Sequence, residues 1–209
     1  MAQKGFSFNG ARCTGCKACM LACKDYHDLS PDVSFRQVYE YAGGKWTAAE
    51  DGTFVQNCFA YYVSVACNHC SNPACIRVCP TGAMHKDDNG LVSVDHARCI
   101  GCGYCEFSCP YNAPTVDRVA GHSVKCDGCS SRVAEGLRPI CVEACPLRAL
   151  GFGDAGNLKS RANACLSIPP LPDPELTSPN LVIVKPKWYD DRADDINQLG
   201  ALANIREIN

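Results

Sequence analysis

The distribution of cysteine constrains this chain more than any other feature of its sequence. Eighteen of the 209 residues are cysteines, far above ordinary usage. Sixteen of them form four groups, which indicates an internal repeat. The groups are Cys13, Cys16, Cys19 and Cys23; Cys67, Cys70, Cys75 and Cys79; Cys99, Cys102, Cys105 and Cys109; and Cys126, Cys129, Cys141 and Cys145.

Three kinds of site use this many cysteines: disulfides, zinc sites and iron–sulfur clusters. A disulfide scaffold is typical of short secreted chains with a signal peptide. Residues 1–9 hold no apolar stretch of that kind, so we expect no export signal of the chain's own. The longest apolar run, residues 59–67, is too short to cross a bilayer. We therefore expect a chain that does not itself span a membrane.

The first and third groups both have the spacing Cys-x-x-Cys-x-x-Cys-x-x-x-Cys. In this spacing three close thiolates hold one 4Fe–4S cluster, and the fourth cysteine reaches the neighbouring cluster. Gly15 and Gly101 lie inside the first Cys-x-x-Cys of these groups, where the backbone must pass close to the cluster. Proline follows the last cysteine of three groups, as in bacterial ferredoxins, whereas Lys24 follows that of the first.

Four zinc sites with four cysteines each are the main alternative, and the fourth group alone looks like a zinc ribbon. Zinc ribbons use paired Cys-x-x-Cys knuckles, whereas three cysteines at successive two-residue gaps supply one thiolate too many per knuckle. The spacings and prolines therefore favour iron–sulfur clusters over a zinc-stabilised interaction module. The two ungrouped residues, Cys58 and Cys165, are expected to be small buried hydrophobic residues.

Composition and motifs argue against other function classes. The formal net charge of −2 gives no electrostatic reason to expect nucleic acid as a partner. The sequence holds no Ser–His–Asp set, phosphate loop or dinucleotide fingerprint. We therefore expect a chain that is not an enzyme by itself.

Three cations directly precede the first cysteines of groups one, three and four: Arg12, Arg98 and Lys125. A cluster with four thiolates carries negative charge, so a nearby cation stabilises its reduced form and raises its potential. These residues are candidates for tuning cluster potentials. The alternative is that they are solvated charges at the starts of loops.

Short strands and tight turns are predicted between the groups. Residues 59–66 are rich in aromatic and β-branched side chains, which favour a strand. Residues 83–86 and 91–95 flank Asn89-Gly90 and predict a hairpin, and a turn is expected at Gly43-Gly44. From residue 168 onward several prolines predict an extended path. The apolar run 181–184 would lie on the surface of this chain or pack on another subunit.

Several longer segments carry a family resemblance. They are Arg12-Cys13-Thr14-Gly15-Cys16-Lys17, Val33-Ser34-Phe35-Arg36, Phe59-Ala60-Tyr61-Tyr62, Gly82-Ala83-Met84-His85-Lys86, Lys125-Cys126-Asp127-Gly128-Cys129 and Cys145-Pro146-Leu147-Arg148-Ala149-Leu150. With the four cysteine groups, they resemble the four-cluster electron-transfer subunits of molybdopterin oxidoreductases. The sequence is similar, more closely, to the iron–sulfur (B) subunits of dimethyl sulfoxide reductases. This resemblance covers about residues 5–155 well and the tail loosely.

The resemblance implies an α+β fold of two ferredoxin-like modules, each with two 4Fe–4S clusters. Residues 1–30 and 117–155 would form an outer module, 58–116 an inner module, 31–57 an insertion, and 156–209 an extended tail packed on a partner subunit. The pairing of groups would be nested, although spacing alone also permits sequential pairing. The implied ligand sets are Cys13, Cys16, Cys19 and Cys145; Cys126, Cys129, Cys141 and Cys23; Cys67, Cys70, Cys75 and Cys109; and Cys99, Cys102, Cys105 and Cys79.

The resemblance also implies a role in a respiratory complex. Electrons would pass from a quinol-oxidising membrane anchor subunit, beside the cluster of Cys99, to a molybdopterin catalytic subunit beside the cluster of Cys13. In nitrate reductase-like relatives a tryptophan in place of the second cysteine of group three gives a three-iron cluster, so Cys102 argues for four 4Fe–4S clusters. Polysulfide, thiosulfate or aromatic dehydroxylating reductases are the alternative complexes. The chain would associate peripherally with a membrane through its partners. It would be exported folded with a twin-arginine partner, or otherwise be cytoplasmic.

Two histidines near cysteines are candidate functional residues. His85 lies six residues after Cys79, which the family pairing assigns to the cluster nearest the electron donor. Quinol oxidation releases protons, which imidazole accepts near neutral pH. His85 is therefore a candidate residue at the boundary with the quinol-oxidising subunit. The alternative is that His85 only caps the hairpin on a solvated face. His69, between Cys67 and Cys70, is a candidate donor to a cluster sulfur.

Overall fold

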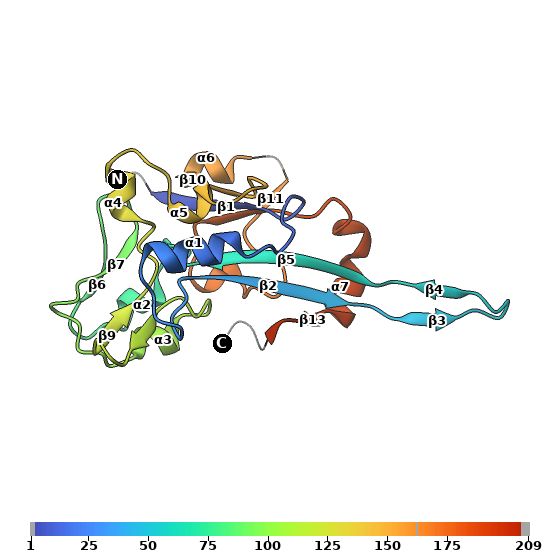
Figure 1. The fold of residues 1–209 in the computed structure, drawn as a ribbon, viewed down its shortest axis with the longest axis horizontal. Helices are drawn as coiled ribbons and strands as arrows, with labels where there is room; N and C mark the ends of the chain where they lie inside the picture. The colour runs from blue at the N-terminus through green and yellow to red at the C-terminus, as the bar shows by residue number, and fades with distance from the viewer. Residues whose placement is uncertain (1–2, 162, 206–209) are drawn as a thin grey trace.

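The computed structural model of the protein describes residues 3–161 and 163–205 and combines short helices with short strands (Figure 1). The mixed α and β composition expected from the sequence is confirmed. The expected ranges 1–30 and 156–209 include residues 1–2, 162 and 206–209, which lie outside the described residues. The strands are β1 (Lys4–Asn9), β2 (Arg36–Gly43), β3 (Trp46–Ala48), β4 (Phe54–Gln56), β5 (Phe59–Ala66), β6 (Met84–Lys86), β7 (Val92–Val94), β8 (Thr115–Asp117), β9 (His122–Val124), β10 (Leu150–Asp154), β11 (Ala164–Cys165), β12 (Leu181–Val184) and β13 (Ala201–Leu202). The helices are α1 (Ala18–Tyr26), α2 (Ala74–Arg77), α3 (Tyr104–Ser108), α4 (Ser130–Ala134), α5 (Ile140–Glu143), α6 (Ala155–Lys159) and α7 (Ala193–Leu199), with 3-10 turns at Pro174–Leu176 and Asp190–Arg192.

Each cysteine group places its third cysteine on a short helix. These cysteines are Cys19 on α1, Cys75 on α2, Cys105 on α3 and Cys141 on α5. Helix α1 packs against α5, and α2 packs against α3. The first group therefore lies beside the fourth, and the second beside the third.

A four-stranded sheet ties distant parts of the sequence together, with the strand order β10-β1-β12-β11. Strand β1 pairs antiparallel with β10 and parallel with β12. Phe6 and Phe8 of β1 are buried in the larger hydrophobic core, which also includes Val63 and Ile183. The N-terminal strand is thus held by segments more than 140 residues away in sequence.

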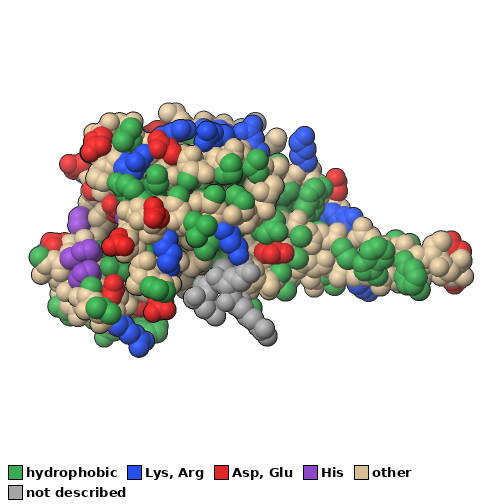
Figure 2. Space-filling view, viewed as in Figure 1, with side chains coloured by type: hydrophobic (Ala, Val, Ile, Leu, Met, Phe, Trp, Pro, Cys, Tyr) green, Lys and Arg blue, Asp and Glu red, His purple; other side chains and the backbone are tan. Residues whose placement is uncertain are grey.

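The predicted strand at residues 59–66 is confirmed as β5, which pairs antiparallel with β2 along its whole length. Beyond this pair, β3 and β4 continue the same hairpin as an arm that projects from the body (Figure 1). Trp46, Phe54 and Val55 of the arm are exposed, and Figure 2 shows hydrophobic side chains on the surface of the arm. The predicted turn at Gly43-Gly44 is wrong. The chain reverses instead around Gly52, whose φ of 82° suits a turn.

The short hairpin predicted around Asn89-Gly90 is also confirmed. Strands β6 and β7 pair with Met84 opposite Val94. Gly90 has a φ of 72°, as the turn requires.

The tail differs from the expected extended path. Leu181–Val184 form β12, an inner strand with β1 on one side and β11 on the other. Leu181, Val182 and Ile183 are at most 2% exposed. Residues 181–184 were expected either to lie on the surface of this chain or to pack on another subunit, and both expectations are wrong. Their backbone pairs with β1 and β11, and most of their side chains are buried within this chain. Farther on, β13 pairs with β2.

No helix within residues 3–161 and 163–205 combines the length and apolar character needed to cross a membrane.

Candidate metal centres

The sixteen grouped cysteines gather into four sets of four. Three sets line separate cavities: the Cys13 set (Cys13, Cys16, Cys19 and Cys145), the Cys67 set (Cys67, Cys70, Cys75 and Cys109) and the Cys99 set (Cys79, Cys99, Cys102 and Cys105). The space between the atoms that line each cavity, part of it open to solvent, is about 340, 350 and 330 Å³ respectively. Similar volumes and identical donors indicate that the three cavities suit the same kind of guest.

The remaining cysteines, Cys23, Cys126, Cys129 and Cys141, form the Cys126 set and are all buried. Cys23 is close enough to Cys141 and Cys129 for their thiolates to repel, and Cys126 is likewise close to Cys23. Cys23 thus lies with the fourth group, and Cys79 lies in the cavity of the third group. The four sets have the composition of the nested ligand sets; that each set holds a cluster is a proposal made below.

Shared hydrophobic cores connect the four sets. Cys19 and Cys141 share the larger core, which joins the Cys13 set to the Cys126 set. Cys126 packs in the smaller core with Cys67 and Cys105, which joins the Cys126 set to the other two. Among the grouped cysteines only Cys16 of the Cys13 set and Cys102 of the Cys99 set are exposed. These two sets therefore reach the protein surface.

Polar hydrogens point at cysteine sulfurs in the Cys13, Cys126 and Cys99 sets. The backbone donors are Ala149 to Cys145 (3.2 Å), Gly128 to Cys126 (3.4 Å), Met84 to Cys79 (3.4 Å) and Ser123 to Cys99 (3.3 Å). In the Cys67 set, the Ala113 backbone hydrogen-bonds Cys109 and acts to lower the pKa of that thiol, although burial raises it overall. Donors of this kind favour thiolate over thiol and raise the potential of a bound cluster.

Burial keeps most of these thiols protonated when no metal is bound. It raises the pKa of Cys13, Cys70 and Cys129 to about 11, and the pKa of Cys23 and Cys75 to about 12. Metal ligation requires thiolates, so cluster binding at neutral pH must release these protons. The sites therefore combine dense sulfur donors with low solvation, which suits a buried inorganic cluster.

Of the three predicted tuning cations, Lys125 is buried. Its Nζ donates to the carbonyl oxygens of Val92 and Cys126. Its charge lowers the pKa of the Cys75 and Cys109 thiols against the larger raising effect of burial. Lys125 thus lies between the Cys126 and Cys67 sets, and the alternative of a solvated charge is wrong for this residue.

The other two predicted cations are exposed. The Arg98 guanidinium donates to the carbonyl oxygen of Thr81 at 2.6 Å and so fixes the loop that follows Cys79. The Arg12 side chain makes no hydrogen bond or ion pair with another described residue. That Arg12 and Arg98 tune cluster potentials stays a prediction.

Sequence reasoning missed Arg36, the first residue of β2. Its guanidinium is buried, and Nη1 donates to the Ser64 hydroxyl at 3.1 Å. A signal was available, because residues two apart in a strand face the same side, and Val38 is a buried residue of the same strand. Because arginine is mostly exposed in proteins, the residue type predicts that Arg36 lies on the surface. Its position in the strand, on the same side as Val38, predicts that it is buried.

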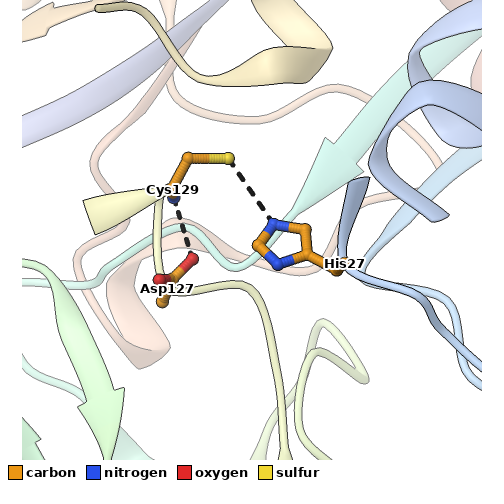
Figure 3. Close-up of side chains that lie close together, drawn as sticks. All are labelled: His27, Asp127 and Cys129. Carbon is orange, nitrogen blue, oxygen red and sulfur yellow. Dashed lines mark hydrogen bonds between the residues drawn. The ribbon is translucent and has the colours of Figure 1, made fainter. Parts of the chain in front are cut away.

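His27, Asp127 and Cys129 form a second cluster of potential ligands (Figure 3). His27 Nε2 lies 3.5 Å from Cys129 Sγ, and the Cys129 backbone N–H donates to Asp127 Oδ1 at 2.8 Å. The Ser130 hydroxyl donates to the other carboxylate oxygen at 2.8 Å. Since Cys129 belongs to a four-cysteine set, we interpret His27 as a hydrogen-bond partner of that sulfur rather than as part of a separate metal site.

The two predicted histidines differ in environment. His85 is exposed on β6, with Nδ1 3.0 Å from the Ala83 carbonyl oxygen. His69 is fully buried, and burial holds its pKa well below the usual value. Its Nδ1 accepts from the Val92 N–H at 2.9 Å, so the neutral ring carries its proton on Nε2. This Nε2 has no hydrogen-bond partner among the described residues, which leaves it available to a buried sulfur.

The ungrouped cysteines were both predicted to be buried. The prediction is wrong for Cys58. This residue is exposed because it lies where the arm leaves the body. Cys165 is partly buried, and its thiol donates to the Ile183 carbonyl oxygen at 3.4 Å.

Comparison with known proteins gives full-length similarities. Residues 58–155 match the 4Fe-4S dicluster domain family. The protein is 54% identical over 208 residues to the B subunit of the anaerobic dimethyl sulfoxide reductase of Haemophilus influenzae, covering 100% of both sequences. It is 53% identical over 206 residues to the subunit of the same name in Escherichia coli, covering 99% of this protein and 98% of that one. The B subunit of the polysulfide reductase of Wolinella succinogenes is 38% identical over 192 residues, which are 90% of this protein and 97% of that one.

Proposed function

We propose a specific electron-transfer path for this protein, which belongs to the family of B subunits of anaerobic dimethyl sulfoxide reductases. Members of this family are iron–sulfur subunits of molybdopterin reductase complexes, and the protein is an electron-transfer subunit that binds iron–sulfur clusters. The finer proposal is that four 4Fe–4S clusters connect a quinol-oxidising membrane subunit with a molybdopterin catalytic subunit. The single observation that carries it is that two of the four cysteine sets, the Cys13 set and the Cys99 set, each contain an exposed cysteine. In this proposal the four sets form a row with these two sets at its ends.

Each cysteine set holds one 4Fe–4S cluster in this proposal. Four thiols per set match the requirement of the cluster, and the backbone N–H groups described above favour the thiolate form. When bound, each cluster supplies a one-electron redox centre. The protein's own residues bind the clusters, exclude water from them and fix the spacing between them. Catalysis belongs to another subunit of the complex.

The two modules follow from the same pairing. Residues 1–30 and 117–155 form the outer, discontinuous module, and residues 58–116 form the inner module. The packing of α1 on α5 and of α2 on α3 supports this division. The pairing of β1 with β10 supports the discontinuous unit, because it joins the two separated ranges.

The ends of the row have different surroundings, which suggest a direction. Around exposed Cys102, the side chains of Ile100, Tyr104 and Phe107 are also exposed. An apolar surface of this kind fits contact with another subunit, and we assign it to the membrane anchor. The end at Cys16 then faces the catalytic subunit. The protein is peripheral in this arrangement, and we propose that the complex is exported with a twin-arginine partner or otherwise lies in the cytoplasm.

A polysulfide or thiosulfate reductase complex is the second candidate, since one relative is the B subunit of a polysulfide reductase. The identity to the dimethyl sulfoxide reductase subunits is higher, 54% against 38%, which favours the dimethyl sulfoxide reductase type. Family membership removes the zinc-stabilised module as an alternative.

Cys102→Ser tests the path in the assembled complex. The change leaves three thiolates in the Cys99 set, so we expect its cluster to convert to a three-iron form with an altered EPR spectrum. Quinol-driven turnover should fall at least tenfold, while turnover with a reduced dye that feeds the catalytic subunit directly should persist. Cys58→Ser, at an exposed ungrouped cysteine, is the control. Unchanged EPR and unchanged quinol-driven turnover would contradict the proposal.

The same two assays test His85, which we propose lies at the boundary with the quinol-oxidising subunit. His85→Gln should slow quinol-driven turnover and spare dye-driven turnover, because the imidazole that accepts a proton is lost. His96→Gln, at another exposed histidine, is the matched control. Equal loss in both assays, or no loss in either, would count against this role.

A further inference from the structure

Arg36 is a buried cation with unused hydrogen-bond donors. Its exposed fraction is 2%. Nη1 bonds the Ser64 hydroxyl, but Nε and Nη2 have no hydrogen-bond partner among the described residues. The guanidinium also lies over the Phe6 ring, 5.1 Å from its centroid. Burying a charge with unpartnered donors is costly, so a partner of opposite charge is expected at this position.

The surroundings of Arg36 supply that partner on two sides. The guanidinium lies close enough to Cys19 of the Cys13 set, and to Cys23 and Cys141 of the Cys126 set, for their charges to interact. Ser64 links it further to the first set, since the Ser64 hydroxyl lies 3.4 Å from Cys19 Sγ. Arg36 therefore lies between two of the proposed clusters.

We propose that Arg36 is the fixed counter-cation shared by the clusters of the Cys13 and Cys126 sets, and that its free N–H groups hydrogen-bond their sulfurs. This inference rests on the proposed function. Arg36 is a positioning and tuning residue, since it does not itself carry electrons. It stabilises the reduced, more negative form of both clusters and so raises both potentials.

Arg36 and Lys125 act differently in this scheme. The Lys125 ammonium donates two of its three hydrogens to backbone carbonyl oxygens, so at most one hydrogen is left for a sulfur and its charge is its main effect on the clusters. Arg36 presents a planar fork of donors, two of whose nitrogens have no partner among the described residues. It therefore acts through both charge and hydrogen bonds, and on the half of the row nearer the catalytic subunit.

The test is an EPR-monitored redox titration of the full complex carrying Arg36→Met. We expect the reduction equilibrium constants of the Cys13-set and Cys126-set clusters to fall at least tenfold, which is about 59 mV for a one-electron couple. The Cys99-set cluster, at the far end of the row, should keep its potential and serves as an internal control. Arg36→Lys retains the charge, so it should shift both potentials by less than half of the shift caused by Arg36→Met. Arg118→Met removes an exposed arginine and should shift nothing.

If Arg36→Met fails to load its clusters, Arg36→Gln takes its place, because glutamine keeps N–H donors without the charge. The role of Arg36 would be overturned if the variant retained all its iron and the potentials of the Cys13-set and Cys126-set clusters did not shift. An equal shift in the potentials of all four clusters would overturn it as well. Failure of the underlying function is distinguishable, since the wild-type complex would then lack the four cluster signals before any residue is changed.

Discussion

The residue before the second cysteine of each group sets the path of the backbone into its cavity. Gly15, His69, Gly101 and Gly128 occupy this position, and all have positive φ, between 45° and 75°. At Gly15 an added Cβ would lie 2.4 Å from the Tyr62 ring, and at Gly101 it would lie 2.4 Å from the Gly121 carbonyl oxygen. The glycines were predicted to allow close approach to a cluster. The structure adds that neighbouring protein atoms also exclude a side chain.

Gly101→Ala should therefore impair the Cys99 set. The change combines a left-handed backbone, which costs alanine about 1–2 kcal/mol, with a clash against backbone that cannot rotate away. We expect the β8–β9 turn and Cys102 to move, with loss or marked weakening of the EPR signal of that cluster. Gly121→Ala is the matched control, because its φ is 73° but nothing lies within 4 Å of the added Cβ. Equal effects of the two variants would refute the steric explanation.

At this scale the grouped cysteines could be recognised from the sequence, whereas most of their electrostatic partners could not. The cysteines form motifs that can be recognised by spacing, and Lys125 could be found because it adjoins Cys126. Arg36 adjoins no cysteine in sequence and reaches the thiols only through the pairing of β2 with β5. His69 was recognised by its place between two cysteines, but its tautomer depends on Val92, a contact between separate segments.

At the scale of elements, the tail closes the Cys67 set. The Ser71 and Asn72 N–H groups donate to the carbonyl oxygens of Ser178 and Thr177, at 2.8 and 3.0 Å. Thr177 lines the cavity of that set. The Asn180 side chain is buried and donates to the His69 carbonyl oxygen at 2.8 Å. This tail segment thus holds the loop between Cys67 and Cys75 in place.

Asn180→Ala should loosen this loop. The buried carbonyl of His69 would lose its shorter hydrogen bond and keep only the Gln3 Nε2 donor at 3.4 Å, at a cost of about 1 kcal/mol for the lost bond. We expect a lower thermal midpoint and faster loss of the Cys67-set cluster to an iron chelator, followed by EPR. Asn197→Ala, at an exposed asparagine on α7, is the control. A cluster as resistant as in the wild type would show that the tail does not secure it.

The elements that the sequence predicted are the locally encoded ones. Strand β5 has an aromatic and β-branched composition, and the β6–β7 hairpin has a turn sequence between its strands. Strand β12 has only four residues among prolines, and its neighbour β1 lies more than 170 residues away. Local patterns carry no information about such pairing, and the same holds for β13 on β2. The sequence therefore did not predict that residues 181–184 form an inner strand of this protein.

At the scale of the whole molecule, the two halves have unequal cores. The larger core joins β1, β2, β5, β10 and β12 through aromatic and aliphatic side chains. The smaller core contains Ala66, Met84, Val92 and Ala113 besides four cysteines. With so few large apolar side chains fully buried, the clusters proposed for this half supply much of its internal contact. The projecting arm lies at the opposite end of the molecule (Figure 1).

The central claim is that sixteen cysteines bind four 4Fe–4S clusters in one polypeptide. The most direct measurement is the iron and zinc content per polypeptide in the anaerobically purified complex, after subtraction of any cluster in the catalytic subunit, with Mössbauer spectra of the same sample. Four clusters of four irons predict about sixteen irons per polypeptide, all in 4Fe–4S form, and negligible zinc. A fully loaded protein with about eight or twelve irons, or with zinc in any of the four cysteine sets, would contradict the claim.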